Sequence, residues 1–306
     1  MQHPSKPLAK TRQGTLAGSA EQGIHIWRGI PYAAPPVGPL RWRAPQPAAR
    51  WQGVRPAETF SAASWQDIDY CRELGGGDPG AFSEDCLYLN VWAPASAAQP
   101  QPLPVMVWLH GGGFTIGAGS LPPYDGKALA SRDVVVVTVN YRLGHLGFFA
   151  HPALEEEAGE RLYNFALLDQ IAALQWVQEN IHAFGGDAAN VTLFGESAGA
   201  RSVLSLMASP KAKGLFHKAI IQSGYTLPDL PREKALEKGA CWRNTSPYRK
   251  PALRNCGRSR GGLLVAHRAA EYRASAYCRR RGAAAADAGD LLCRPPASDT
   301  GDDRLQ

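Results

Sequence analysis

The stretch VTLFGESAGA, residues 191–200, decides the fold of this chain. It begins with a short apolar run of β-forming residues and leads into a region with apolar residues at helical spacing. These helically spaced residues are Ala200, Val203, Leu204 and Met207. The sequence therefore predicts a strand, a sharp turn and a helix. Ser197 lies at the turn between Gly195 and Gly199, in the G-x-S-x-G pattern of a nucleophile elbow.

The two glycines of this pattern have a steric reason. The serine must adopt a strained backbone conformation, and side chains at the flanking positions would collide with the neighbouring strand and helix. The turn lifts the serine hydroxyl above the sheet at a helix N-terminus, where free N–H groups stabilise negative charge. A pentapeptide of this kind also arises by chance in a glycine-rich chain. The strand before it and the helix after it favour the functional interpretation.

Outward from this turn, strands alternate with helices, which predicts an α/β fold with a largely parallel sheet. Several strands are nearly continuous apolar runs, typical of strands buried on both faces. The predicted strands are 11–16 paired with 24–30, then 87–94, 103–110, 133–142, 191–194 and 218–222. Residues 164–184 carry apolar side chains every three to four positions and predict an amphipathic helix.

A glycine-rich loop, His110 to Phe114, follows the predicted strand at 103–110. Three successive glycines leave backbone N–H groups open to a ligand, as an oxyanion hole for acyl transfer requires. The alternative is a flexible turn without chemistry. Since sites in such sheets form at the carboxyl ends of strands, this loop and Ser197 are predicted to share one edge.

The composition, 44% hydrophobic and 20% charged, is that of a soluble globular protein. No apolar run reaches the roughly 18 residues that span a bilayer, and the first residues lack the apolar segment of a secretory signal. We therefore expect a cytoplasmic protein without a membrane partner. The sequence shows no metal-ligand cluster and no phosphate-binding loop, so we expect no metal and no cofactor.

The composition changes near residue 240. Residues 241–306 hold twelve arginines and one lysine against six acidic residues, together with four of the six cysteines. Residues 1–240 are balanced, with 20 basic and 21 acidic residues. We predict a folded domain over 1–240 and an atypical tail over 241–306.

This tail has three interpretations: a basic nucleic-acid-binding segment, a disordered extension, or an out-of-frame translation. We favour the third. A shift by one base turns Cys241–Trp242 into leucine within an amphipathic phrase, and Asn255–Cys256 into leucine within another. The balanced charge of 1–240 gives no support to a nucleic-acid partner.

Two longer segments carry a family resemblance. EDCLYLNVWAP, residues 84–94, and FGGDAANVTLFGESAG, residues 184–199, resemble the signatures of the type-B carboxylesterases, which include cholinesterases and bacterial para-nitrobenzyl esterases. RGIPYAAPPVGPLRWRAPQP, HGGGF and NYRLGHLGFF are similar to further segments of that family, in the same order. The resemblance runs from about residue 11 to about residue 238. It implies an α/β-hydrolase fold, a central mostly parallel sheet with helices on both faces, with the C-terminal part of the family missing.

The resemblance also implies a reaction, the hydrolysis of small-molecule carboxylic esters through an acyl-serine intermediate. Ser197 would be the nucleophile, and the N–H groups of Gly112, Gly113 and Ala198 would form the oxyanion hole. Glu196 is interpreted as a turn residue, because its side chain cannot reach the base from the adjacent position.

Two cysteines of the matched region leave an open question. In exported members of the family a disulfide corresponds to Cys71 and Cys86. Without a secretory signal, two ordinary buried thiols are the alternative.

A serine nucleophile needs a histidine to take its proton and an acid to orient that histidine, and in this fold both follow the serine. Of the downstream histidines, His217 is interpreted as structural and His267 falls in the tail. Asp229 and Glu233 are interpreted as solvated, and His110 is expected to support the glycine loop. We therefore expect the triad acid and histidine to be missing and the activity to be weak or absent. The alternative is a non-catalytic binding module like the adhesion relatives of cholinesterases, although those typically lose the serine.

Overall fold

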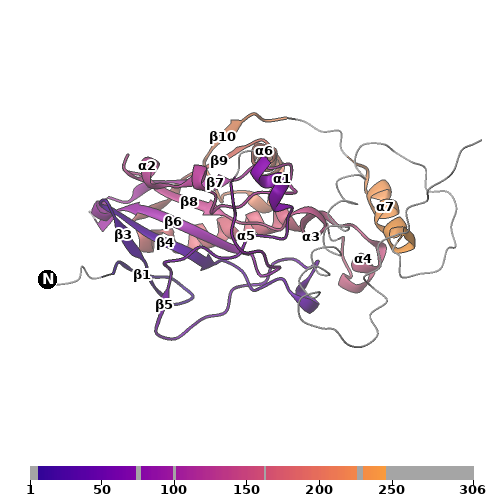
Figure 1. Cartoon of the computed structure of the whole chain (residues 1–306), viewed down its shortest axis with the longest axis horizontal. Helices are drawn as coiled ribbons and strands as arrows, with labels where there is room; N and C mark the ends of the chain where they lie inside the picture. Colours follow the sequence, from indigo (N-terminus) through magenta and orange to yellow (C-terminus); the bar gives the residue numbers. More distant parts are fainter. Residues whose placement is uncertain (1–5, 74–76, 99–100, 162, 226–229, 246–306) are drawn as a thin grey trace, which may run out of the picture. The chain divides into compact units, whose positions relative to one another are not determined.

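The computed structural model describes residues 6–73, 77–98, 101–161, 163–225 and 230–245 (Figure 1). The chain divides into two compact units, 1–257 and 258–306, and the second unit lies outside the described residues. Asp229, His267 and the predicted tail from 246 onward also lie outside them. None of the described helices has the length and apolar character needed to cross a membrane.

Strands and helices alternate through the described residues. The strands are β1 (Leu8–Lys10), β2 (Thr15–Ala17), β3 (Ser19–Glu21), β4 (Ile24–Pro31), β5 (Val54–Pro56), β6 (Tyr88–Pro94), β7 (Leu103–Leu109), β8 (Val135–Val139), β9 (Gly186–Glu196) and β10 (Lys218–Gln222). The α-helices are α1 (Ile68–Glu73), α2 (Lys127–Ala130), α3 (Gly144–Phe148), α4 (Pro152–Ala158), α5 (Phe165–Asn180), α6 (Ala198–Ala208) and α7 (Arg232–Thr245). Short 3₁₀ turns are η1 (Gly38–Leu40), η2 (Ala95–Ala98), η3 (Pro122–Tyr124), η4 (Ile181–Phe184) and η5 (Pro210–Ala212).

The main sheet has the strand order β10-β9-β7-β8-β6-β4-β3, with β10 at the upper margin of Figure 1. The pairs β10–β9, β9–β7 and β7–β8 are parallel, whereas β8–β6, β6–β4 and β4–β3 are antiparallel. The sheet is therefore mixed. Four of its seven strands, β8, β7, β9 and β10, have the predicted parallel arrangement. This parallel part includes β9, which leads into Ser197.

The predicted pairing of 11–16 with 24–30 is wrong. β4 pairs with β3 across the two-residue turn Gln22–Gly23, whose φ angles are 51° and 79°. Two positive φ angles in a two-residue loop match the twist of a hairpin, so this turn selects the neighbouring segment as the partner of β4. β2 instead pairs with β1 and β5 in a separate three-stranded sheet.

Helices cover both faces of the main sheet, as the resemblance implied. One face consists of side chains in register across the central strands: Val105, Val107 and Leu109, then Val135, Val137 and Val139, then Val191 and Leu193. These belong to one core cluster with Leu174 and Val177 of α5 and with Val203 and Leu206 of α6. On the other face, Trp92 and Val136 pack with Ala130 of α2. The period of two in these strands explains the two clusters, because alternate side chains point to opposite faces.

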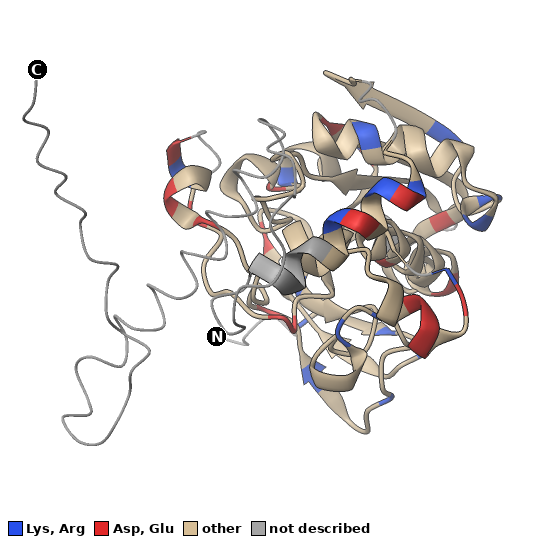
Figure 2. Ribbon diagram, turned by 90° about the vertical axis from the view of Figure 1, so that its right-hand side faces the viewer, with Lys and Arg blue, Asp and Glu red and all other residues tan. Residues whose placement is uncertain are grey.

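Basic and acidic residues are interspersed along the ribbon of the described elements (Figure 2). Arg142 and Asp169 differ from a typical surface pair, since their side chains are 2% and 0% exposed. The Arg142 guanidinium donates from Nε to Oδ2 of Asp169 at 2.8 Å and from Nη2 to Oδ1 at 2.7 Å. Nη2 also donates to the backbone carbonyl of Arg43 at 2.9 Å. This pair therefore ties the segment after β8 to α5 and to the chain near residue 43.

The predicted domain boundary at residue 240 falls within α7. Arg232 at the start of this helix forms an ion pair with Glu155 of α4. At Gly239, an added Cβ would lie 1.7 Å from the backbone oxygen of Ala150, so the helix approaches the preceding segment closely. The helix therefore continues across the residue at which the composition changes.

Candidate active site

Ser197 lies in a strained turn between β9 and α6, with φ 52° and ψ −115°. The flanking glycines are required by close backbone contacts. A Cβ at Gly199 would lie 2.0 Å from the carbonyl oxygen of Leu109, and a Cβ at Gly195 would lie 2.6 Å from the carbonyl carbon of Gly199. Positive φ is unusual for a non-glycine residue and accompanies functional turns. The structure thus has the strand, turn and helix predicted from Val191 to Met207, and side chains at both glycine positions would collide with the neighbouring backbone as predicted.

The backbone of Ser197 is held from two sides. Its N–H donates to the carbonyl of Gln222 at the end of β10 at 2.9 Å, and its carbonyl accepts from the N–H of Arg201 at 2.9 Å. The first bond ties the turn to β10, and the second starts α6. Among the described residues, none forms a hydrogen bond with the Ser197 hydroxyl.

The glycine loop lines the same hollow as Ser197 and lies beside it, since a Cβ at Gly111 would be 3.3 Å from the Ser197 Cβ. Gly112 and Gly113 have φ angles of 102° and 59°, and the Gly112 carbonyl accepts from the N–H groups of Thr115 and Ile116 at 3.0 and 3.1 Å. A Cβ at Gly112 would lie 2.3 Å from the Ile116 carbonyl oxygen. Glycine is therefore required there by both conformation and space.

The hollow itself has a volume of about 310 Å³, and its wall includes both Ser197 and the glycine loop. Its lining residues are Tyr70, Cys71, Gly111, Gly112, Gly113, Thr115, Ile116, Gly117, Leu121, Tyr124, Glu196 and Ser197. Within the described part of the chain, no acceptor takes a hydrogen bond from the backbone N–H groups of Gly112, Gly113 or Ala198. The structure thus brings a hydroxyl and unpaired backbone donors to the wall of one hollow.

His110 supports the glycine loop from inside the fold. Its ring is 1% exposed and stacks on Tyr141 with centroids 4.3 Å apart. Nδ1 lies 2.9 Å from the Gly111 carbonyl, and the Tyr141 hydroxyl donates to the His110 carbonyl at 2.6 Å. Burial lowers the pKa of His110 to about 4, so the ring is neutral at physiological pH.

This buried neutral ring predicts a loss of stability in mild acid. Because the unfolded histidine binds a proton below its ordinary pKa of 6.5 and the folded one does so only near 4, the stabilisation is complete above pH 6.5 and is lost as the pH falls toward 4. Between pH 7.5 and pH 5, His110 should account for about 2 kcal/mol of unfolding free energy. Urea unfolding at both pH values measures it, with His110→Gln as the control that removes the titrating group. Equal pH dependence in the two proteins would contradict the assignment.

Several residues around the hollow were not predicted. Gln66 holds the segment that follows the glycine loop, because its Nε2 donates to the Gly117 carbonyl at 2.8 Å and its Oε1 accepts from the Gly117 N–H at 2.7 Å. Tyr70 and Tyr124 line the hollow. Burial, and to a lesser degree the charge of Glu196, raise the pKa of Tyr124. No sequence signal could have found these residues, since their contacts join separate segments.

Glu196 ends β9 and also lines the hollow. A Cβ at Gly111 would lie 2.5 Å from its Oε2, so the Glu196 side chain sits against the glycine loop. The position immediately before Ser197 therefore supports the turn and the loop together.

Cys71 and Cys86 are free, buried thiols, so the structure has the thiol alternative and no disulfide between them. They lie in different apolar clusters, Cys71 with Ile116 and Leu121, and Cys86 in the main core with Leu87. Burial raises the pKa of both thiols, which keeps them protonated at neutral pH.

No imidazole forms a hydrogen bond with the Ser197 hydroxyl among the described residues. His217 is structural, because its Nδ1 accepts from the Val191 N–H at 3.2 Å next to the start of β10. Glu233 is exposed at the start of α7. The described residues also contain no group of three His, Cys, Asp or Glu side chains that could hold a metal ion.

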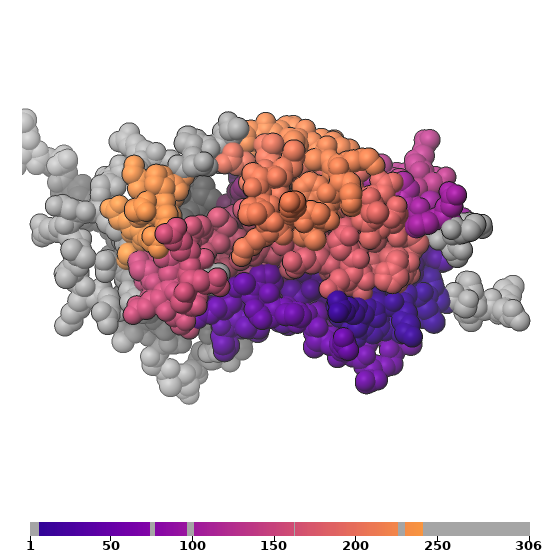
Figure 3. Space-filling view, turned by 180° about the vertical axis from the view of Figure 1, so that it is seen from behind, coloured from indigo at the N-terminus to yellow at the C-terminus, as the bar shows by residue number. Residues whose placement is uncertain are grey.

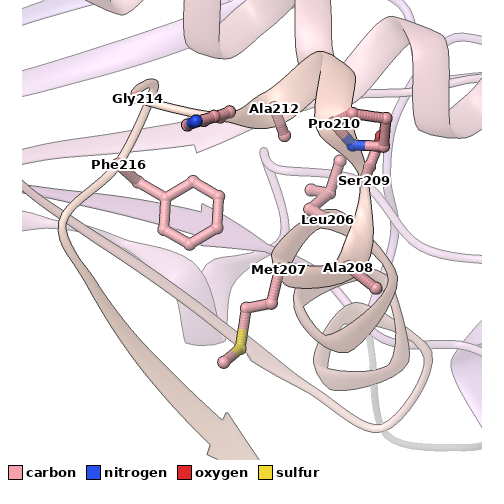
Figure 4. Close-up of a pocket in the computed structure, with 9 residues that line it drawn as sticks. Leu206, Met207, Ala208, Ser209, Pro210, Ala212, Gly214 and Phe216 are labelled. Atoms are coloured by element: carbon pink, nitrogen blue, oxygen red, sulfur yellow. The ribbon is translucent and has the colours of Figure 1, made fainter.

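A second hollow of about 400 Å³ lies at the other end of α6 (Figure 4). It is lined mainly by apolar side chains, including Leu206, Met207 and Phe216. An 11-residue helix is about 16 Å long, so this hollow is remote from Ser197. It offers Lys213 as its charged lining residue and no nucleophile–base pair.

Comparisons with known proteins agree on one family. The carboxylesterase family model matches residues 5–241. The chain is 50% identical over 236 residues to the para-nitrobenzyl esterase of Bacillus subtilis, covering 77% of this chain and 47% of that protein. It is 47% identical over 234 residues to the cocaine esterase of Oryctolagus cuniculus, covering 72% and 43%.

Solved structures of esterases are similar to this chain as well. A thermophilic PNB esterase aligns with a TM-score of 0.71 at 47% identity, covering 78% of this chain and 48% of that chain. The chain therefore spans about half the length of the relatives it matches.

Proposed function

Because the chain belongs to the carboxylesterase family, with its α/β-hydrolase fold, we propose that it is the nucleophile-bearing part of a serine hydrolase of small-molecule carboxylic esters. One observation carries the proposal. Ser197 occupies a strained elbow and shares a hollow with Gly112 and Gly113, whose N–H groups are unpaired among the described residues.

The proposed reaction starts with attack of Ser197 Oγ on the ester carbonyl carbon. The carbonyl oxygen becomes an oxyanion, which the N–H groups of Gly112, Gly113 and Ala198 stabilise. Collapse of this intermediate breaks the bond to the alcohol oxygen and leaves an acyl-serine, and the alcohol departs with the proton that Ser197 lost. Water then attacks the acyl carbon and regenerates the serine and a carboxylic acid.

The proton transfers need a base, and the described residues do not provide one to Ser197. His110 is buried, its Nδ1 lies against the Gly111 carbonyl, and burial lowers its pKa to about 4, which makes the ring a weak base. The proposal therefore assigns attack and oxyanion stabilisation to this half and assigns proton handling to residues outside the described part. The chain by itself is proposed to be weakly active or inactive.

A fusion tests this function directly. Residues 1–240 would be joined to the part of the Bacillus subtilis para-nitrobenzyl esterase that follows the region matched by this chain. The fusion is expected to hydrolyse p-nitrophenyl butyrate, because the two parts together restore a full-length member of the family. The release of p-nitrophenol measures the rate. A folded fusion no faster than its Ser197→Ala variant would show that this half does not carry the nucleophile.

A further inference from the structure

The peptide group that joins Ile116 to Gly117 lies directly against Gly112 of the glycine loop. A Cβ at Gly112 would be 2.3 Å from the Ile116 carbonyl oxygen. The Gly112 carbonyl in turn accepts from the N–H groups of Thr115 and Ile116 at 3.0 and 3.1 Å. Residues 112–116 therefore form one tight turn, and the orientation of the peptide at its end determines where the Gly112 backbone lies.

Gln66 fixes the orientation of this peptide. Its Oε1 accepts from the Gly117 N–H at 2.7 Å, and its Nε2 donates to the Gly117 carbonyl at 2.8 Å. The peptide between Ile116 and Gly117 is trans, so its N–H and its carbonyl point in opposite directions. The N–H points to Gln66, and the carbonyl points to Gly112. One side-chain amide is thus connected to the backbone of the glycine loop through a single rigid peptide group.

Gly117 is also enclosed on the side of His110. Its φ angle is 111°, and a Cβ there would lie 2.3 Å from Nδ1 of the buried His110 ring, which stacks on Tyr141. On the other side, Nε2 of Gln66 donates to the Ser64 carbonyl at 3.1 Å as well as to Gly117. Because both of these acceptors are carbonyls, the amide has one orientation, with its oxygen toward the Gly117 N–H.

Few side chains can make this pair of contacts. A glutamine amide carries a donor and an acceptor side by side, which match the N–H and the carbonyl of one residue. Glutamate has the same length but, when ionised, has no donor for the Gly117 carbonyl, and the thioether of methionine is only a weak acceptor. The contact with Gly117 therefore depends on the amide of Gln66, and it can be removed at nearly constant side-chain length.

We propose that Gln66 is a positioning residue for the ester hydrolysis, which holds the N–H groups of Gly112 and Gly113 where the oxyanion forms. This inference rests on the proposed function. Gln66 is not among the residues that line the hollow, so it acts through Gly117 and not by contact with the substrate. An oxyanion hole stabilises charge that exists only in the transition state. Loss of the Gln66 amide should therefore lower kcat and leave substrate binding nearly unchanged.

Gln178 provides a matched control in another part of the molecule. It is also a half-buried glutamine, and its Nε2 donates to the backbone carbonyls of Ala188 at 2.9 Å and Leu215 at 3.0 Å. Leu215 belongs to the segment that links α6 to β10, a part of the chain that forms the orange surface in Figure 3. Gln178 does not line the hollow. Its replacement therefore removes comparable contacts without acting on the glycine loop.

The first test uses the fusion of residues 1–240 with the C-terminal part of the Bacillus subtilis para-nitrobenzyl esterase. Gln66→Met should lower kcat for p-nitrophenyl butyrate about 10- to 100-fold and change KM by less than about twofold. The inhibition constant of a trifluoromethyl ketone, whose adduct with Ser197 carries the same oxyanion, should rise by a similar factor. Gln66→Glu removes the donor alone and should lower kcat as well. Gln178→Met should leave all three constants unchanged.

The second test uses the full 306-residue chain and needs no activity. Hydrogen exchange followed by NMR reports on the amides of Thr115 and Ile116, which bond to the Gly112 carbonyl and not to Gln66. Relative to the amides of β7, both should exchange about tenfold faster in Gln66→Met, because the peptide that ends their turn is released. Gln178→Met should leave their exchange unchanged.

The outcomes separate this inference from the proposed function. An active fusion in which Gln66→Met and Gln66→Glu lose no more kcat than Gln178→Met would overturn the positioning role, while the function would stand. A higher KM at unchanged kcat would overturn it too, because the amide would then serve substrate binding. If Gln66→Met does not fold, Gln66→Glu decides between these results.

Hydrogen exchange separates the remaining cases. Unchanged exchange of the Thr115 and Ile116 amides in Gln66→Met would show that the amide does not hold the loop, and the inference would be wrong. An inactive fusion together with faster exchange of these amides would contradict the proposed function and support the hold of Gln66 on the glycine loop.

Discussion

The chain on its own should hydrolyse p-nitrophenyl butyrate on the order of 10⁶-fold more slowly than the fusion with a complementary half. Its rate should equal that of its own Ser197→Ala variant. The reason is that nucleophile and base act as a unit, so removing one of them costs about as much as removing both. Among the described residues the Ser197 hydroxyl has no imidazole partner, which leaves the attack without a proton acceptor.

The measurement is p-nitrophenol release from four proteins: the chain, the fusion, and the Ser197→Ala variant of each. The fusion variant is the informative control, because it should fall to the level of the unfused chain. Ser197-dependent turnover by the unfused chain, even at a modest rate, would show that a base reaches the serine after all. The claim of a disabled site would then be wrong, whereas the assignment of Ser197 as the nucleophile would stand.

Asp169→Ala should lower the free energy of unfolding by about 3–5 kcal/mol, because it leaves the buried Arg142 guanidinium without its counter-ion. Both side chains are at most 2% exposed, and two hydrogen bonds join them. Urea unfolding at neutral pH measures the change. The effect is expected on stability and not on the chemistry, since neither residue lines the hollow beside Ser197.

Two controls separate buried charge from lost contacts. Glu179 lies on the same helix and pairs with Arg12, but these side chains are 42% and 60% exposed. Glu179→Ala should therefore change the unfolding free energy by less than about 1 kcal/mol. The double variant Arg142→Met with Asp169→Leu removes both charges and should recover most of the stability. A double variant as unstable as Asp169→Ala would mean that the pair acts through its hydrogen bonds to the segment near Arg43.

The sequence predicted the part of the fold that repeats a simple period. β7 and β8 are continuous apolar runs that lie within the predicted ranges, and α5 lies within the predicted helix. The predicted amphipathic character of that helix is wrong, because Asp169, Gln170 and Asn180 are buried together with its apolar side chains. A second wrong prediction was the strand pairing near the N-terminus, where the strands are short and their sequence pattern is ambiguous. There the turn at Gln22 and Gly23 decides which segment pairs with β4, and its positive φ angles are not visible in a propensity pattern.

The candidate site divides in the same way. Ser197 and the glycine loop could be found because the proposed chemistry demands fixed residue types at fixed spacing. Gln66, Tyr70 and Tyr124 could not, because no motif marks them and only the folded structure brings Tyr70 and Tyr124 to the hollow and Gln66 to Gly117. The state of Cys71 and Cys86 was also open, since spacing alone does not show that the two thiols lie in different clusters.

The conformation of Ser197 also limits how this site could have evolved. Threonine carries the same hydroxyl, but a branched Cβ is strongly disfavoured at a positive φ such as the 52° found here. Threonine is therefore not expected to replace serine at this position. Cysteine has an unbranched side chain at Cβ and would fit the same backbone.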